Sequence, residues 1–141
     1  MFNRILVVCV GNICRSPTAE FMLKSALPGK HISSAGLGAL VGHDMDAQAR
    51  TVAEQQGLSC PKHQARQLTR ELCHEADLIL VMEQRHRDGV TQLCPEARGK
   101  VFLIGQDADI ADPYRQSDAF FQRTYAQLQA GCSAWAKRLA R

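Results

Sequence analysis

A cysteine and an arginine near the start of the chain have the spacing of an oxyanion-binding loop. Cys9 and Arg15 are separated by five residues in the segment CVGNICR. A loop of this length can wrap a phosphate, with the thiolate beneath it, the backbone N–H groups pointing inward and the arginine binding two oxygens. The thiolate can then attack phosphorus in line while the arginine and the N–H groups stabilise the equatorial oxygens. The spacing therefore indicates phosphoryl transfer through a phosphocysteine intermediate.

The same spacing occurs three times, so its context must identify the relevant copy. The pairs are Cys9 and Arg15, Cys60 and Arg66, and Cys132 and Arg138. The last pair lies in a helical pattern whose N–H groups are already bonded, and the middle pair lacks glycine and follows no strand. The first pair bounds a segment that follows an apolar strand and precedes a helix, which Ser16 is expected to cap. Gly11 permits a positive φ there and Asn12 tolerates one.

The proposed chemistry also needs an acid. A tyrosinate leaving group is poorly stable at neutral pH because the pKa of a phenol is about 10, so a carboxylic acid must supply a proton. A loop at residues 106–116 offers Asp107, Asp109 and Asp112. The chemistry alone does not rank them. Asp112 has the attraction that Pro113 restricts its backbone and Tyr114 would flank an aromatic substrate.

Alternating apolar strands and amphipathic helices would position these residues. We expect strands at 5–10, 31–34, 77–82 and 101–104, and helices at about 16–27, 46–56, 69–76 and 84–93. A final helix carries an apolar stripe at Phe121, Tyr125, Leu128, Cys132, Trp135 and Leu139. Continuously apolar strands predict a parallel sheet covered on both faces. The expected fold is a single doubly wound α/β domain over residues 1–141, with about four strands and the phosphate-binding loop after the first.

Composition narrows the class of protein. The chain has 141 residues, 45% of them hydrophobic and 22% charged, which fits one globular domain and not a disordered chain or coiled coil. A net charge of +3 does not predict nucleic-acid binding. No apolar run is long enough to insert in a membrane or serve as an export signal. We therefore expect a cytoplasmic protein whose 6 cysteines are reduced.

Two segments together resemble the low-molecular-weight protein tyrosine phosphatases. The segment from Val8 to Pro17 resembles the N-terminal phosphate loop of that family, and Asp112-Pro113-Tyr114 resembles its general-acid motif. Their order and their separation of about one hundred residues also fit, and the resemblance spans the whole chain. It implies a phosphotyrosine phosphatase that needs no cofactor and no metal.

Carried over by position, the resemblance assigns the catalytic roles. Cys9 would be the nucleophile, Arg15 the phosphate clamp, and Asp112 the acid and then the base. Ser16 would stabilise the thiolate. The phosphate would also be bound by the loop residues Val10, Gly11, Asn12, Ile13 and Cys14.

The resemblance also assigns supporting roles. Asn12 and Ser34 would hold the strained loop through hydrogen bonds, and Leu40 and Tyr114 would wall the cleft. Cys14 matches a second loop cysteine whose reversible disulfide with the nucleophile can protect it from over-oxidation. A thiol with no redox role is the alternative for Cys14.

A branch within the family is also indicated. Residues 34–42 look like the bacterial members linked to capsule and exopolysaccharide export, and Arg115 follows Tyr114 where eukaryotic members often have a second tyrosine. The implied partner is a phosphotyrosyl protein, the tail of a membrane tyrosine autokinase. We expect a monomer that neither enters the membrane nor binds nucleic acid.

Three other functions remain to be weighed. An arsenate reductase on the same fold needs two further cysteines, but Met82 and Gly89 occupy the corresponding positions. A non-catalytic phosphotyrosine- or oxyanion-binding module would keep Arg15 without needing the nucleophile or the acid. A zinc site would use Cys60, His63, Cys73 and His74, with irregular spacing.

Overall fold

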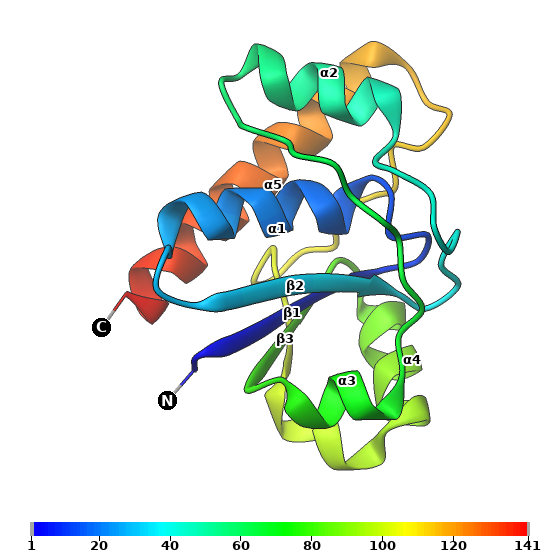
Figure 1. Ribbon diagram of the computed structural model, residues 1–141, viewed down its shortest axis with the longest axis vertical. Helices are drawn as coiled ribbons and strands as arrows, with labels where there is room; N and C mark the ends of the chain where they lie inside the picture. The colour runs from blue at the N-terminus through cyan, green and yellow to red at the C-terminus, as the bar shows by residue number, and fades with distance from the viewer. Residues whose placement is uncertain (1, 141) are drawn as a thin grey trace.

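The computed structural model describes residues 2–140 and contains a four-stranded parallel sheet between helices, as predicted (Figure 1). The strand order is β2-β1-β3-β4, with bounds β1 Arg4–Cys9, β2 His31–Gly36, β3 Leu78–Val81 and β4 Val101–Leu103. The helices are α1 Arg15–Ala26, α2 Ala47–Gln55, α3 Arg70–Glu75, α4 Gln84–Leu93, the 3₁₀ helix η1 Pro95–Lys100, and α5 Asp118–Leu139. Since β1 is an inner strand, the loop that follows it opens at the middle of the sheet's carboxyl edge.

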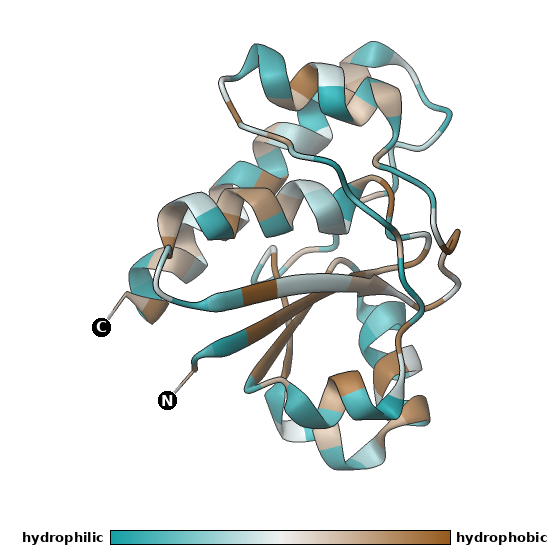
Figure 2. Ribbon diagram, in the orientation of Figure 1, coloured by the Kyte–Doolittle hydropathy of each residue, from teal (hydrophilic) through white to brown (hydrophobic). Residues whose placement is uncertain are grey.

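The two faces of the sheet bury separate cores. Successive residues of β1 alternate, so Ile5 and Val7 face the core formed with α1, α2 and α5, while Leu6 and Val8 face the core formed with α3 and α4. Figure 1 shows α1 and α5 on one side of the sheet and α3 and α4 on the other. In Figure 2 β1 and β3 are mostly hydrophobic, whereas β2 and the outer helices mix both kinds of residue. This burial on both faces explains the unbroken apolar runs of the strands.

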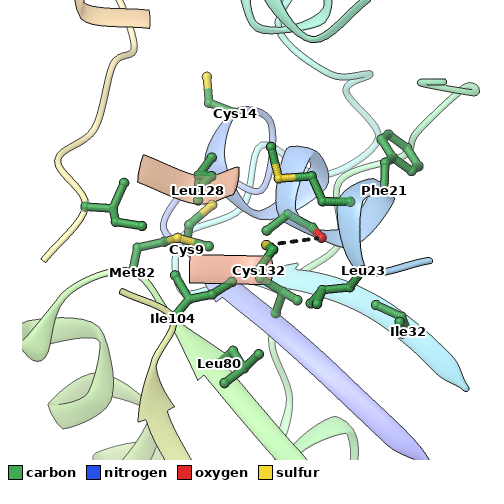
Figure 3. Packing of buried hydrophobic residues seen from close by; sticks show 14 of the residues in the cluster. Cys9, Cys14, Phe21, Leu23, Ile32, Leu80, Met82, Ile104, Leu128 and Cys132 are labelled. Atoms are coloured by element: carbon green, nitrogen blue, oxygen red, sulfur yellow. Dashed lines mark hydrogen bonds between the residues drawn. The ribbon is translucent and has the colours of Figure 1, made fainter. Parts of the chain in front are cut away.

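The apolar stripe of α5 packs against α1 and the sheet, as predicted. Leu128 and Cys132 lie over Ile104 in the close view of this core (Figure 3). Cys132 Sγ lies 3.9 Å from the carbonyl oxygen of Ala19, and burial raises the pKa of its thiol to about 12. Cys132 is therefore a protonated core residue, and its spacing from Arg138 is coincidental.

Side chains cap the first turns of α2, α3 and α5. Thr69 caps α3 by accepting from the backbone N–H of Leu72, as predicted, and Asp46 caps α2 in the same way through Ala49. Gly57 has a φ of 85° just beyond α2, in the left-handed region that favours glycine. Ser16 does not cap α1, contrary to the prediction, because Cys14 holds the cap position and the serine lies inside the first turn.

Other boundaries differ from the sequence prediction by a few residues. The first strand runs from Arg4 to Cys9 and leaves Val10 exposed, and the second continues to Gly36. The helix η1 was not predicted, and α5 begins at Asp118, before the first residue of its apolar stripe. Among residues 2–140, no helix combines the length and the apolar character that crossing a membrane would require.

Candidate active site

The loop between β1 and α1 points its carbonyl groups away from the site. Each carbonyl from Cys9 to Cys14 accepts a hydrogen bond from the surrounding chain. The donors are, in order, the N–H groups of Leu37, Gly38 and Leu40, the His63 ring, and the N–H groups of Asp46 and Thr18. In a trans peptide the N–H points opposite to the C=O, and no peptide bond here is cis. The N–H groups of residues 10–15 are therefore aimed at the concave side of the loop, as an oxyanion requires.

Two backbone positions make this loop shape possible. Asn12 has a φ of 59°, whereas Gly11 does not have a positive φ, so the asparagine provides the left-handed turn that was predicted for either residue. Gly36 of β2 lies so close to the loop that an added Cβ would overlap the carbonyl oxygen of Val10. Gly36 is therefore required for space and not for its dihedral angle.

A buried chain of hydrogen bonds connects the loop to β2 and α1. The Asn12 side-chain N–H₂ donates to Ser16 Oγ at 2.8 Å and to Ser34 Oγ at 2.9 Å. Ser34 in turn donates to Glu20 Oε1 at 2.5 Å, and Ser16 Oγ lies 2.9 Å from Cys9 Sγ. Because Asn12 donates to the Ser16 oxygen, the Ser16 proton is available to the sulfur. The predicted network around Asn12 and Ser34 is thus present, with Glu20 as an unforeseen member.

The segment around Cys60 and Arg66 supports the loop without forming a second one. The backbone N–H of Arg66 donates to Asn12 Oδ1 at 3.0 Å, and its Nε donates to the Ser34 carbonyl at 2.8 Å. The His63 ring nitrogen Nε2 lies 2.7 Å from the Asn12 carbonyl oxygen. No pattern in the sequence connected these residues to the loop, since His63 lies 51 positions and Arg66 54 positions after Asn12.

Arg15 is buried and held from two sides. Its Nη1 donates to Glu83 Oε2 at 2.5 Å and to the Ile110 carbonyl at 2.7 Å, and its Nη2 lies 3.8 Å from Asp112 Oδ2. Burial alone would raise the pKa of Glu83, but hydrogen bonds from Arg15 and Arg85 outweigh burial and lower it. Glu83 is therefore an anion that neutralises the buried guanidinium, and the sequence analysis missed it.

His86 lies beside this ion pair and was also missed. It is only 1% exposed, and its Nε2 is 3.5 Å from Glu83 Oε2. Within residues 2–140, neither of its ring nitrogens has a hydrogen-bond partner. Burial, and then the positive charge of Arg15, lower the pKa of His86 to about 4, so the ring is neutral near pH 7.

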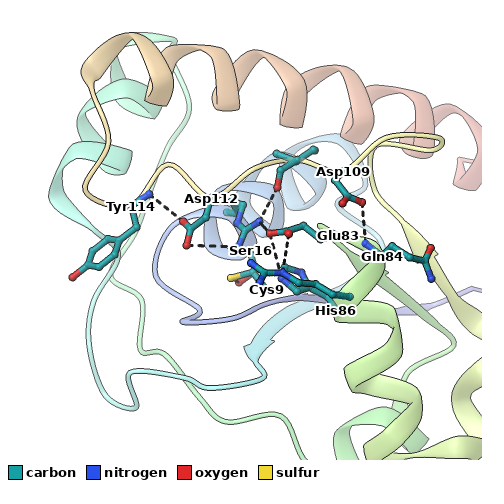
Figure 4. Close-up of polar contacts among 11 residues, drawn as sticks. Cys9, Ser16, Glu83, Gln84, His86, Asp109, Asp112 and Tyr114 are labelled. Carbon is teal, nitrogen blue, oxygen red and sulfur yellow. Dashed lines mark hydrogen bonds and ion pairs between the residues drawn. The ribbon is translucent and has the colours of Figure 1, made fainter.

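The structure separates the three aspartates that the sequence left equivalent. Asp109 accepts from the backbone N–H of Gln84 at 2.9 Å, at the start of α4, and Asp107 is exposed. Asp112 faces Arg15, and its Oδ1 accepts from the Tyr114 backbone N–H at 3.0 Å (Figure 4). Asp112 is therefore the aspartate placed at the loop.

These residues line one cavity of about 210 Å³. Its walls are Cys9, Val10, Gly11, Ile13, Cys14, Arg15, Gly38, Leu40, Asp112 and Tyr114. Charge is concentrated at Arg15 and Asp112, and Leu40 and Tyr114 add apolar surface. A ligand with an anionic end and an aromatic body matches this distribution.

Cys14 is chemically different from Cys9. Burial first, and then the negative charges of Asp46 and Asp112, raise the pKa of the Cys14 thiol far above its usual range. In Figure 3 the Cys14 sulfur points away from Cys9. Cys14 is thus held as a thiol within the loop.

The zinc site considered from the sequence is not formed. His63 contacts the loop carbonyl of Asn12, and the Cys60 thiol lies 3.7 Å from the Leu58 carbonyl. Within residues 2–140, the donors that cluster are instead His74, Cys94 and Glu96. Of the four residues weighed for that alternative, only His74 belongs to this cluster.

Comparisons with known proteins agree with this geometry. The family model described as low molecular weight phosphotyrosine protein phosphatase matches residues 4–141. The chain is 50% identical over 142 residues to the Escherichia coli K12 low molecular weight protein-tyrosine-phosphatase Wzb, covering 99% of this chain and 97% of that protein. It is 48% identical over 144 residues to the probable phosphatase AmsI of Erwinia amylovora, covering 100% of both.

Solved structures give the same result. The crystal structure of Erwinia amylovora AmsI has a TM-score of 0.97, covering 100% of this chain and 95% of that one at 48% identity. Vibrio vulnificus Wzb in complex with benzylphosphonate has a TM-score of 0.96, covering 99% and 100% at 49% identity. The YwlE arginine phosphatase of Geobacillus stearothermophilus has a TM-score of 0.91, covering 97% and 92% at 34% identity. The chain belongs to the low molecular weight phosphotyrosine protein phosphatase family.

Proposed function

We propose that residues 1–141 act as a single protein tyrosine phosphatase domain in which Cys9 is the nucleophile. The observation that carries the proposal is the convergence of Cys9, Arg15 and Asp112 on one cavity beneath a loop of inward N–H groups. Family membership and the relatives named as tyrosine phosphatases support it.

The first step forms a bond from Cys9 Sγ to phosphorus and breaks the bond from phosphorus to the tyrosine oxygen. Asp112 gives its proton to the departing oxygen, so tyrosine leaves neutral. The Ser16 hydroxyl, 2.9 Å from the sulfur, stabilises the thiolate form of Cys9. With Nη1 of Arg15 held by Glu83 and Ile110, its Nε and Nη2 are the donors for two phosphate oxygens.

The second step returns the enzyme to its starting state. Asp112, now ionised, takes a proton from water as the water oxygen attacks phosphorus. The bond from phosphorus to sulfur breaks, and inorganic phosphate and the Cys9 thiolate result. No metal or cofactor takes part. Because the first step needs Cys9 as a thiolate and Asp112 as an acid, activity should fall at both low and high pH.

The apolar walls favour phosphotyrosine over other phosphorylated residues. Phosphoserine is too short to bring its phosphorus to the thiolate, whereas an aromatic ring would fill the space between Leu40 and Tyr114. The binding of benzylphosphonate by the Vibrio vulnificus relative is consistent with a ring in this position. Because one structural neighbour is an arginine phosphatase, phosphoarginine is the alternative substrate to compare with phosphotyrosine.

The physiological substrate that we propose is the phosphotyrosyl tail of a membrane tyrosine autokinase in exopolysaccharide or capsule export. This proposal follows from the resemblance of residues 34–42 to that branch of the family and from the relatives named Wzb and AmsI. It also implies a cytoplasmic enzyme that works as a monomer.

The deciding experiment measures hydrolysis of p-nitrophenyl phosphate and a phosphotyrosyl peptide in EDTA by the parent protein and by Cys9→Ser. We expect turnover by the parent and none by the variant, and Asp112→Asn should slow the peptide reaction while still binding phosphate. Phosphoseryl peptide and phosphoarginine should be poor substrates. If the reduced parent binds vanadate but turns over no phosphate ester, the loop is an oxyanion receptor and the enzyme proposal fails.

A further inference from the structure

A second group of reactive side chains lies at the opposite edge of the sheet from Cys9. His74 is in α3, Glu96 is in η1, and Cys94 joins α4 to η1. Both α3 and η1 come immediately before strands, so this group lies near the amino ends of β3 and β4. The phosphate loop follows the carboxyl end of β1, so the two sites are separate.

The donor atoms of these three residues are already close together. The imidazole Nε2 of His74 is 2.8 Å from Glu96 Oε2, and Cys94 Sγ is 3.8 Å from the same oxygen. All three donor atoms lie within 4.8 Å of one another. A tetrahedral Zn²⁺ with bonds of about 2.0–2.3 Å separates such ligands by roughly 3.4–3.6 Å. Shifts of about 1 Å therefore suffice to bring the three donors to coordinating distances.

The side chains that must move are able to do so. The side chains of His74 and Glu96 are 52% and 51% exposed. Cys94 is fully buried, and this packing fixes the position of its sulfur. Arg70 Nη2 is 3.0 Å from Glu96 Oε2, but this arginine is itself 53% exposed. An exposed ion pair of this kind contributes little to stability, so a metal ion can replace it at the carboxylate.

The donor types select a class of metal. Thiolate and imidazole favour Zn²⁺ and similar transition ions, whereas Mg²⁺ and Ca²⁺ prefer oxygen ligands throughout. One thiolate and one carboxylate together also neutralise the charge of a divalent ion. We propose that His74, Cys94 and Glu96 form a Zn²⁺ site, with water as the fourth ligand, that links α3 to η1. Zn²⁺ binding releases the Cys94 proton to solvent. The metal site takes no part in phosphate hydrolysis.

Cobalt titration tests this proposal in a Cys9→Ser background, which removes the thiolate of the phosphate loop as a competing ligand. We expect one equivalent of Co²⁺ to give a thiolate-to-cobalt charge-transfer band and the intense visible bands of tetrahedral coordination. His74→Ala and Glu96→Gln should weaken binding at least tenfold. His43→Ala, at another exposed histidine, should bind like the parent.

A second readout guards against variants that fold poorly. Zn²⁺ at a hundredfold excess over its Kd for the parent should raise the Tm of the parent by about 5–10 °C, and that of His74→Ala by about half as much or less. Circular dichroism without metal should show that Cys94→Ser retains the fold. With Co²⁺, the same variant should give no charge-transfer band. The proposal is overturned if Co²⁺ gives no thiolate band, or if the band survives both His74→Ala and Glu96→Gln.

Discussion

His86 should make the stability of this protein depend on pH in a window where most histidines have little effect. The ring is 1% exposed and its pKa is lowered from 6.5 to about 4, first by burial and then by Arg15. The other charged groups that act on it are Glu83, Arg85 and Asp109. The gap of about 2.5 pH units corresponds to about 3.4 kcal/mol of differential proton binding.

The sign follows from which state binds the proton first. As the pH falls below about 6.5, the unfolded chain protonates His86 while the folded protein does not, so stability is lost. Below about pH 4 both states carry the proton and the loss is complete. Relative to pH 7.5, the expected contribution is a loss of about 1.3 kcal/mol at pH 5.5 and about 2.5 kcal/mol at pH 4.5.

Urea unfolding of the parent and of His86→Leu at these pH values isolates this contribution. The free energy of unfolding of the variant, relative to the parent, should rise by about 1.3 and then about 2.5 kcal/mol as the pH falls from 7.5 to 5.5 and 4.5. His86→Gln packs differently but also lacks a titrating ring. Its free energy of unfolding, relative to the parent, should change with pH by the same amounts. Parallel pH profiles for parent and variants would refute the reasoning, whatever the offset between them.

Three further predictions concern the site. Glu83→Gln leaves the buried charge of Arg15 uncompensated and should lower kcat/KM for p-nitrophenyl phosphate about tenfold to a hundredfold, measured by steady-state kinetics; an unchanged value would exclude a positioning role. Gly36→Ala should lower the free energy of unfolding by about 2 kcal/mol or more, whereas Gly29→Ala, which has open space, should change it little; equal effects would contradict the packing argument. Cys14→Ser should keep its turnover in reductant but recover less activity after peroxide and thiol treatment, and equal recovery would remove the redox role.

The sequence predicted the sheet well because both of its faces are buried. Unbroken runs such as Leu78–Val81 have few alternative structures, and the capping chemistry of Thr69 and Gly57 is local. The start of α1 was misplaced because Ser16 is an ordinary cap residue whose hydroxyl is used by Cys9 and Asn12 instead. A functional contact thus overrode a local preference there.

Within the site, residues adjacent to a motif were predictable and distant supports were not. Asn12 and Ser34 came from the family resemblance, but Glu83, His63 and Arg66 reach the loop only through the fold. One part of this was predictable, because a buried arginine requires an anion close to it. The sequence alone would still not have selected Glu83 from the other carboxylates, since that choice depends on the position of α4.

The outward carbonyl groups of the phosphate loop bear on how this enzyme can choose among phosphoproteins. Because separate segments of the chain hold those carbonyls, the loop has its binding shape before any ligand arrives, and little ordering entropy is lost on binding. The phosphate group will then contribute nearly the same affinity to every substrate. Discrimination must come from the rim, where Leu40 and Val41 are exposed, so exchanges at these two positions should redirect substrate choice without altering phosphate affinity.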